Sequence, residues 1–290
     1  MMRILVTGGS GFLGSHIVDQ LVKEKYSVVS FDLKPSSYKN DEVEEIVGDI
    51  CDVDLLLSAL DKVDAVFHLG AVADIGYSEK NPTKTIEINT LATCKLLDAM
   101  VKKEVKKIYF ASTIYVNSSS GSFYRISKQA CESIISEYSL LNDISFTILR
   151  FGTLWGPRSG NTNAIYNYLF QAAKKDKIDV SGSGDEIREY IHVKDASEIA
   201  VSLLKEKQKC LTFILTGHHQ TKLRDLIETI KELVNKDISI NYLGAKSSHY
   251  LRTPYQYRDD SDIKKIVLNT YQDMGVSLLS LYTDIKKNIE

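Results

Sequence analysis

Tyr124 and Lys128 are the two side chains of this 290-residue chain whose types and spacing best fit acid–base chemistry. Residues four apart on a helix share one face, so a helix through Tyr124-Arg125-Ile126-Ser127-Lys128 would bring the phenol and the ammonium together. A tyrosine with the ordinary pKa of about 10 is protonated at neutral pH, and a neighbouring ammonium stabilises its phenolate. Tyr124 could then act as a general base and, in reverse, as a general acid. A half-buried tyrosine beside a surface lysine has the same spacing, so the pair needs further support.

Thr113 supplies that support by its position. The β-rich run Lys107–Ala111 ends in Ser112-Thr113, and ligands of parallel sheets bind beyond the carboxyl ends of the strands. A hydroxyl at this strand end, eleven residues before Tyr124, can hydrogen-bond the same reacting oxygen and hold it in line. Threonine is also a common turn residue after a strand. We interpret Thr113, Tyr124 and Lys128 together as a catalytic constellation.

A second cluster lies between the apolar run Ile4–Val6 and a helical pattern that starts near His16, and it reads Thr7-Gly8-Gly9-Ser10-Gly11-Phe12-Leu13-Gly14. A strand, a glycine turn and a helix start, in this order, are typical of a site for a dinucleotide pyrophosphate. Gly8 permits the tight turn, Gly11 lets the backbone approach the diphosphate, and Gly14 lets the helix pack on the strand. The first turn of the helix then offers unpaired N–H groups to the phosphates.

Asp32 indicates which dinucleotide binds. It ends the next apolar run, Ser27–Phe31, eighteen residues after Gly14, where a carboxylate accepts hydrogen bonds from the ribose hydroxyls of adenosine. The same carboxylate repels a 2′-phosphate, so the sequence favours NAD over NADP, although the nearby Lys34 weakens this preference. A bound nicotinamide would carry a positive charge that further stabilises the phenolate of Tyr124.

The whole chain alternates β-rich runs with helical periodicity, which is typical of a doubly wound parallel sheet. The predicted strands are Ile4–Thr7, Ser27–Asp32, Glu45–Gly48, Ala65–Leu69, Lys107–Ala111 and Phe146–Phe151. The predicted helices are Phe12–Lys25, Val53–Leu60, Thr83–Lys102, Arg125–Leu141, Asn163–Lys174, Ala196–Lys205, Leu223–Asn235 and Val276–Asn288. We therefore expect an α/β chain. Residues 1–155 would form a Rossmann-type NAD-binding domain, completed by part of 189–217, and residues 156–290 a smaller α/β substrate domain.

Composition excludes several other classes of protein. The formal net charge is −2 with both signs well mixed, which favours neither nucleic-acid nor membrane-surface binding. No apolar run approaches the ~18 residues of a membrane span, and no signal-peptide pattern precedes the glycine turn. The cysteines Cys51, Cys94, Cys131 and Cys210 are widely separated and have no metal-type spacing. We expect a cytoplasmic enzyme with reduced thiols and no bound metal.

The motifs in this order resemble those of the extended short-chain dehydrogenase/reductase family, in particular its NAD-dependent nucleotide-sugar epimerase/dehydratase group. The resemblance covers nearly the whole chain. It rests on TGGSGFLGSH at 7–16, Asp32, Gly48-Asp49-Ile50, HLGAVAD at 68–74, Asn81-Pro82, Asn89 with Ala92-Thr93, Ser112-Thr113, YRISK at 124–128, LRFGTLWGP at 149–157 and REYIHVKDA at 188–196.

This resemblance implies roles for further residues. At the diphosphate and adenosine end of the cofactor, Ser10, Phe12 and Leu13 would join the glycine loop, and Asp49 and Ile50 would flank the adenine. Leu69, Gly70 and Ala71 would line the dinucleotide channel, and Asn89 would support the strand tips. At the other end, Lys128 would also bond the nicotinamide ribose, and Phe151 would pack near the nicotinamide. Around the substrate, Arg188 would grip the diphosphate of a nucleotide sugar, Arg252 and Arg258 are weaker phosphate candidates, and Thr153, Asn161 and Asn163 would lie toward the sugar.

Departures from the family pattern lie on the sugar side. Dehydratases of the family carry an acidic pair just after the threonine, where this chain has Ile114-Tyr115, so elimination of water is disfavoured. Val116-Asn117-Ser118 replaces the valine-tyrosine-glycine of many epimerases, and Phe123 and Thr153 replace a proline and an asparagine. The loop before Tyr124 is also short. These changes affect the identity of the sugar and leave the use of the cofactor intact.

The resemblance implies reversible hydride transfer at a secondary alcohol of a nucleotide sugar, at C4. A 4-epimerase is favoured, and a 4-dehydrogenase or 4-ketoreductase is the alternative. A non-catalytic NAD-sensing protein would not need Tyr124 and Lys128, so their presence disfavours that reading. The resemblance also implies a homodimer that pairs helices Thr83–Lys102 and Arg125–Leu141. Their apolar residues Ile88, Leu91, Leu96, Ile134 and Ile135 have roughly helical spacing, and they could equally face their own sheet.

Overall fold

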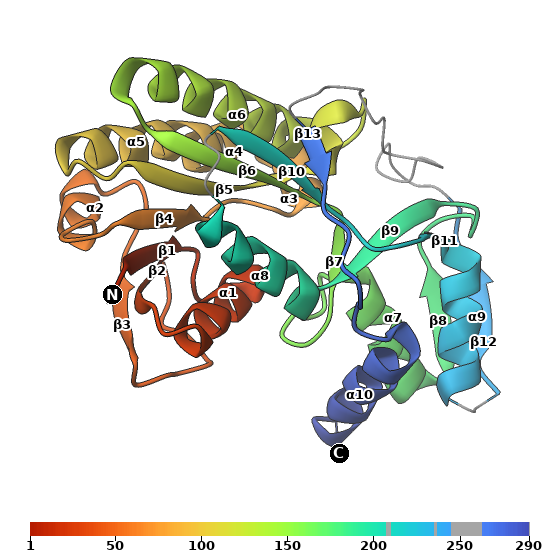
Figure 1. Ribbon diagram of the computed structural model, residues 1–290. Coiled ribbons are helices and arrows are strands. Elements are labelled where there is room, and N and C mark those ends of the chain that lie inside the picture. Colours follow the sequence, from red (N-terminus) through yellow and green to blue (C-terminus); the bar gives the residue numbers. More distant parts are fainter. Residues whose placement is uncertain (207–209, 235–236, 245–262, 290) are drawn as a thin grey trace.

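A central parallel sheet organises the chain. The computed structural model describes residues 1–206, 210–234, 237–244 and 263–289. Within them, eight strands lie in the order β13-β10-β6-β5-β4-β1-β2-β3, with helices on both faces (Figure 1). The strands are β1 (Arg3–Thr7), β2 (Ser27–Asp32), β3 (Val43–Val47), β4 (Ala65–His68), β5 (Lys107–Thr113), β6 (Ser145–Phe151), β10 (Leu211–Leu215) and β13 (Ile263–Lys265). The predicted Rossmann-type, doubly wound sheet is confirmed.

Each face of the sheet has its own hydrophobic core. Ile4 and Val6 pack beneath helices α1 (Phe12–Lys23) and α8 (Val193–Ser202). Leu5, between them in sequence, packs on the opposite face beneath α2 (Val53–Ala59), α5 (Ala92–Lys102) and α6 (Ser122–Asn142). Strands that are apolar on both sides suit a sheet covered by helices on both faces. Only the strand ends are then left to bind ligands.

The predicted helix Thr83–Lys102 is confirmed in extent, but it is not a regular α-helix throughout. The chain instead forms α4 (Pro82–Ile86), a π-helical turn over Glu87–Leu91, and then α5. A π turn inserts one residue into the helical repeat, and such turns are frequent at functional sites. Periodicity alone could not reveal it, because the apolar pattern continues through the turn.

Helix α3 (Ile75–Lys80) was not predicted, because six residues are too few for a clear helical period. Its first turn is capped by Asp74, whose carboxylate accepts the N–H of Tyr77. The hydroxyl oxygen of Ser78 accepts the backbone N–H of Tyr124 at 3.3 Å. This short helix therefore helps to place the first turn of α6.

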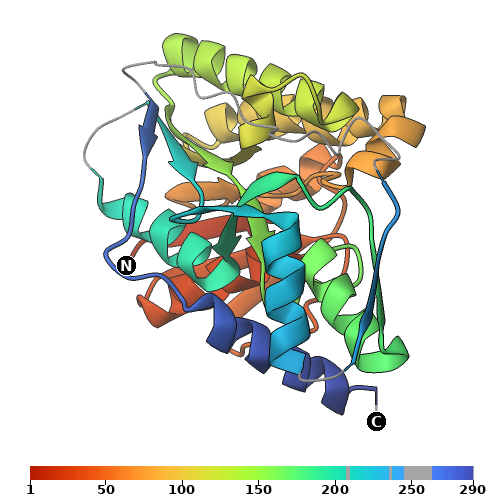
Figure 2. The same cartoon turned by 90° about the vertical axis from the view of Figure 1, so that its right-hand side faces the viewer.

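The C-terminal half adds two small sheets and then returns to the large one. Strands β7 (Thr153–Trp155), β9 (Ile187–His192) and β11 (Gln220–Lys222) form one small sheet, and β8 (Lys177–Val180) and β12 (Ser239–Tyr242) form the other. Helices α7 (Ala164–Lys175), α9 (Leu223–Val234) and α10 (Met274–Lys287) pack together beside them around a third core (Figure 2). Because β10 and β13 belong to the large sheet, both halves of the chain build it. The domain division at residue 155 remains a prediction.

Among the described helices, none is both long and apolar enough to cross a membrane.

Two buried histidines predict a stability that falls in acid. Burial lowers the pKa of His68 to about 3 and that of His192 to about 4, so both are neutral in the folded chain. An unfolded histidine titrates near 6.5, so stabilisation is complete above that pH and is lost as the pH falls toward 4. Well below pH 6.5 each histidine costs about 1.4 kcal/mol per pH unit, and the pair costs roughly 3 kcal/mol between pH 6.5 and 5.

Urea unfolding between pH 7.5 and 5 measures this loss. His192→Asn keeps an oxygen that can cap α8 in place of the ring nitrogen that accepts the N–H of Lys194, and we expect it to flatten the pH dependence by about half. His218→Gln changes an exposed histidine and serves as the control. An unchanged pH dependence in His192→Asn would contradict the prediction.

Candidate active site

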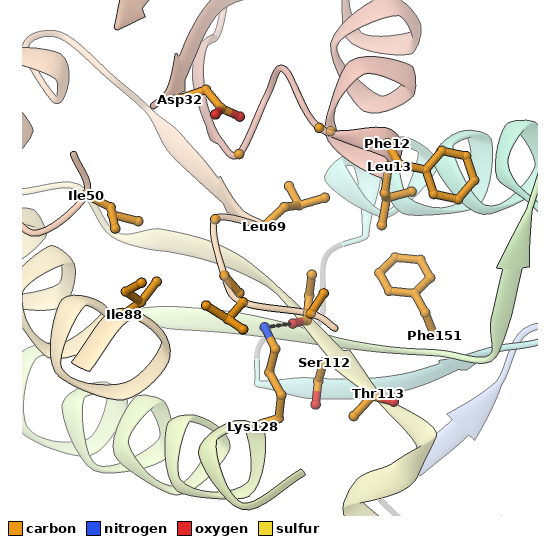
Figure 3. Close-up of a pocket in the computed structure, with 18 of the residues that line it drawn as sticks. Phe12, Leu13, Asp32, Ile50, Leu69, Ile88, Ser112, Thr113, Lys128 and Phe151 are labelled. Atoms are coloured by element: carbon orange, nitrogen blue, oxygen red, sulfur yellow. Dashed lines mark hydrogen bonds between the residues drawn. The ribbon is translucent and has the colours of Figure 1, made fainter. Parts of the chain in front are cut away.

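The carboxyl ends of the central strands open into one cavity of about 500 Å³ (Figure 3). Asp32 lies toward one end of it, and Thr113 and Phe151 lie toward the other. Its described lining is Gly8, Gly11, Phe12, Leu13, Gly14, Phe31, Asp32, Leu33, Gly48, Ile50, Leu69, Gly70, Ala71, Val72, Ala73, Ile88, Ala111, Ser112, Thr113, Tyr124, Lys128, Phe151, Gly152 and Leu154. A long, mostly apolar channel with polar groups at its ends suits a dinucleotide.

The glycine loop forms one wall of the cavity. Gly8 has a φ of +72°, and a Cβ there would lie 2.7 Å from the backbone nitrogen of Gly70. A Cβ at Gly14 would lie 2.0 Å from the carbonyl oxygen of Gly8, so α1 packs directly on the loop. Side chains at either position would push these elements apart. The loop therefore fits a diphosphate at the N-terminus of α1, as the sequence predicted.

Asp32 is held in place at the end of the cavity where the sequence predicts the adenosine. One of its carboxylate oxygens accepts the backbone N–H of Ser10 at 3.0 Å, and the hydroxyl of Ser10 donates to the carbonyl of Lys34 at 2.9 Å. The loop after β2 is thus tied to the glycine loop. The other carboxylate oxygen of Asp32 can accept from ribose hydroxyls.

Thr113, Tyr124 and Lys128 meet at the opposite end of the cavity. The hydroxyl of Thr113 hydrogen-bonds that of Tyr124. The ammonium of Lys128 donates to the carbonyl of Ala111 at 2.7 Å (Figure 3). It also lies 4.5 Å from the ring centre of Phe110. The predicted constellation is therefore brought together by the end of β5 and the first turns of α6.

Burial shifts both titratable groups toward neutrality. It raises the pKa of Tyr124 to about 12, and the hydrogen bond from Thr113 opposes this only in part. It lowers the pKa of Lys128 to about 8. The expected stabilisation of the phenolate by Lys128 is not enough here, because the ammonium is directed at Ala111. Tyr124 thus needs a further positive charge nearby before it can act as a base at neutral pH.

Fourteen of the predicted site residues line the cavity. Its described lining does not include Ser10, Asp49, Asn89, Thr153, Asn161, Asn163 or Arg188. Arg252 and Arg258 lie outside the described residues. Asp49 caps the turn before α2 by accepting the N–H of Cys51 at 2.8 Å, and Asn163 caps α7. Asn161 is exposed.

Asn89 braces the site from behind. Its side chain accepts the N–H of Val72 at 2.7 Å and donates to the carbonyl of the same residue at 3.0 Å. It also donates to the hydroxyl of Ser127 at 2.9 Å. The segment after β4 is thereby fixed to α6, which agrees with the supporting position that the resemblance implied.

Arg188 is buried on β9, and one of its guanidinium nitrogens donates to the carbonyl of Ile187 at 2.8 Å. The strand that carries it is set by close backbone contacts. A Cβ at Gly152 would lie 2.9 Å from the carbonyl oxygen of Glu189, and one at Gly217 would lie 1.9 Å from that of Tyr190. Glycines at the ends of β6 and β10 thus let β9 dock on the large sheet. The role of Arg188 toward a diphosphate remains a proposal.

A part-buried ion pair behind Ser112 was not predicted from the sequence. Arg150 on β6 makes two hydrogen bonds to Glu132 on α6, at 3.0 and 2.6 Å, and the hydroxyl of Ser112 donates to the same carboxylate. Ser112 lines the cavity next to Thr113. No spacing along the sequence could have revealed the pair, because Arg150 and Glu132 lie on different elements, eighteen residues apart. The apolar lining residues Phe31, Leu33, Val72 and Ile88 carried no revealing pattern either.

Comparisons with known proteins agree with this site. The chain is 31% identical over 285 residues to a Methanocaldococcus jannaschii protein of proposed UDP-glucose 4-epimerase activity, covering 90% of each chain. It is 28% identical over 264 residues to UDP-glucuronic acid decarboxylase 6 of Arabidopsis thaliana, covering 82% of this chain and 76% of that protein.

A solved structure and a family description complete the comparison. UDP-glucuronic acid 4-epimerase of Bacillus cereus, in complex with UDP-glucuronic acid and NAD, has the same fold, with a TM-score of 0.85 and 24% identity over 99% of this chain and 100% of that one. The NAD dependent epimerase/dehydratase family matches residues 4–212, which include the glycine loop, Asp32 and the Thr113, Tyr124 and Lys128 constellation. The chain belongs to the NAD dependent epimerase/dehydratase family.

Proposed function

We propose that the protein is an NAD-dependent 4-epimerase of UDP-sugars. The observation that carries this proposal is the meeting of Thr113, Tyr124 and Lys128 at one end of a channel whose other end holds the glycine loop and Asp32. NAD is the cofactor of the family, and its extended shape fits between these ends. The UDP-sugar epimerases among the relatives support the choice of substrate and of C4.

Tyr124 moves the proton in the proposed reaction. It takes the proton of the C4 hydroxyl during oxidation and returns it during reduction. Thr113 orients the shared oxygen, and Lys128 supplies a fixed positive charge nearby. NAD bound in the channel would supply the acceptor for the hydride of C4 and its donor on return. Reduction from the opposite face of the 4-keto sugar gives the epimer, with no net change in the oxidation state of either partner.

Two arginines and Ile114 bear on the proposed substrate. We propose Arg188 and Arg252 as partners of the nucleotide diphosphate, because a planar guanidinium suits phosphate oxygens. Ile114 is buried against Ile214 and Ile263, where a dehydratase needs an acidic side chain near the sugar. This position therefore supports chemistry that stops at the 4-keto sugar and its return to an alcohol. A cytoplasmic location, where nucleotide sugars would be available, remains a proposal.

Replacing Tyr124 by phenylalanine tests the proposed base. Tyr124→Phe keeps the ring and removes the hydroxyl, so we expect kcat to fall by about 10²–10⁴. NAD binding should change little, and calorimetry measures it separately. Tyr138→Phe is the control, because Tyr138 bonds Asp98 on the outer side of α5 and α6, away from the cavity. Turnover equal to that of the control would remove Tyr124 from the mechanism.

The fate of the hydride distinguishes the epimerase from a dehydrogenase. An epimerase returns the hydride to the same sugar, so purified enzyme that retains its cofactor should convert UDP-sugars over many turnovers without added NAD. No absorbance should accumulate at the NADH band. One turnover that leaves NADH and a 4-keto product would instead identify a dehydrogenase.

UDP-glucuronate adds a further outcome to the same experiment. A 4-keto uronic acid is a β-keto acid and loses carbon dioxide readily. A pentose product with release of carbon dioxide would therefore place the chain with its decarboxylase relatives instead.

A homodimer through α5 and α6 is also proposed, on a revised set of residues. Of the five residues considered in the sequence, Leu96 and Ile135 are fully buried against the sheet and Ile88 lines the cavity, so these three cannot form a dimer face. Leu91, Ile126 and Leu141 are 50%, 42% and 79% exposed, and they lie on the adjoining π turn and α6. Exposed apolar side chains on these two packed elements support an interface.

Light scattering tests this arrangement. We expect a dimer at micromolar concentration and a monomer for Leu91→Glu combined with Leu141→Glu. Val276→Glu on α10 is the control, because Val276 is 69% exposed but lies in a different part of the chain. A wild-type monomer would overturn the proposal.

A further inference from the structure

His68 is a buried titratable group that the proposed mechanism does not use. It is the last residue of β4, is 1% exposed and lies outside the described lining of the cavity. Its Nδ1 lies 2.7 Å from the hydroxyl oxygen of Thr7, and its Nε2 lies 2.9 Å from that of Thr93. The ring thus joins the end of β1, just before the glycine loop, to the first turn of α5.

The surrounding hydrogen bonds determine the direction of these two contacts. The hydroxyl oxygen of Thr93 lies 2.5 Å from the carbonyl oxygen of Asn89, and two oxygens at that distance need a proton between them. Only Thr93 can supply it, so Thr93 must accept from Nε2–H of His68. The neutral ring then accepts at Nδ1 from the hydroxyl of Thr7, whose oxygen in turn accepts the N–H of Gly70 at 3.2 Å. One neutral tautomer therefore satisfies every group.

The path continues from Asn89 to the catalytic helix. The side chain of Asn89 donates to Ser127, and the hydroxyl of Ser127 donates to the carbonyl of Tyr124 at 2.8 Å. The π turn makes this possible, because it places the Asn89 side chain toward α6 and leaves its carbonyl to Thr93 and to the thiol of Cys131. A continuous set of buried hydrogen bonds thus runs from Gly70, in the cofactor channel, to Tyr124.

We infer that His68 is a positioning residue, which acts through Thr93 and Asn89 to set the place of Tyr124 relative to the cofactor channel. The inference rests on the proposed function of Tyr124. A polar network of this kind is rigid only when every member is satisfied, so loss of one hydroxyl loosens the whole path. Small displacements of a proton-transferring group cost much of its effect, since hydride and proton must move in line.

Thr93 and Thr85 provide a matched pair of variants. Both are fully buried, and each donates its hydroxyl to the carbonyl four residues earlier, at 2.5 Å to Asn89 and 2.8 Å to Asn81. Only Thr93 also contacts His68. Thr93→Val and Thr85→Val therefore remove the same kind of local bond, but only the first breaks the path to Tyr124.

We expect Thr93→Val to lower kcat by about tenfold to a hundredfold, with the KM for the UDP-sugar and the affinity for NAD little changed. The acid limb of its pH–rate profile should also move to higher pH, because Tyr124 would be held less well beside Lys128. Thr85→Val should lose stability and keep both kcat and the profile. Thr7→Val breaks the same path at its other end and should behave like Thr93→Val, which covers the case that one variant does not fold.

Amide hydrogen exchange in the NAD-loaded protein gives a readout that needs no substrate. Exchange at residues 122–128 should speed up in Thr93→Val and not in Thr85→Val. If wild type converts no UDP-sugar, the proposed function fails, while the exchange data still decide on the positioning path. Folded Thr93→Val and Thr7→Val proteins that match Thr85→Val in kcat, pH profile and exchange would overturn the inference.

Discussion

Direct packing of backbone against backbone at the carboxyl edge of the sheet is the constraint on which the other features depend. At Gly8 and Gly14 a Cβ would lie 2.7 and 2.0 Å from backbone atoms of neighbouring elements. Three elements, β1, β4 and α1, can meet here only because these positions have no side chain. Their close approach brings the N-terminus of α1 to the channel and places Ser10 where it can hold Asp32. The cavity therefore depends on the absence of side chains at these two glycines.

The two ends of the channel differ in how far burial disfavours a charged side chain. At one end the side chain of Asp32 faces the cavity, where hydroxyl groups of a ligand can reach it. At the other end, burial disfavours both the phenolate of Tyr124 and the ammonium of Lys128. Tyr124 therefore favours the phenol when its surroundings are neutral and the phenolate when a cation stands close. An oxidised nicotinamide is cationic and a reduced one is neutral, so the tyrosine would be a base for oxidation and an acid for reduction.

Local sequence patterns were enough to predict the sheet, the glycine turn between β1 and α1, and the meeting of Thr113, Tyr124 and Lys128. Gly8, Asp32 and Tyr124 each have a role that depends on near neighbours in sequence or on a strand end, and both are visible in a single chain. The π turn at Glu87–Leu91, helix α3 and the Glu132–Arg150 pair were missed, since they depend on contacts between distant segments. Burial is likewise a property of the folded chain. It could not have been foreseen that the pKa of Tyr124 rises, or that Leu96 and Ile135 face the sheet.

The position of β10 between β6 and β13 has a consequence for how the protein is made. Phe213 and Leu215 of β10 share one hydrophobic core with Leu149 and Phe151 of β6 and with Ile199 of α8. A nascent chain that ends near residue 155 would leave the edge of β6 unpaired and this face of the sheet uncovered, which favours aggregation. The ribosome must therefore release β10 before this face of the sheet is complete. Every described residue that lines the cavity precedes residue 155, yet the sheet that carries these residues is completed only by the second half of the chain.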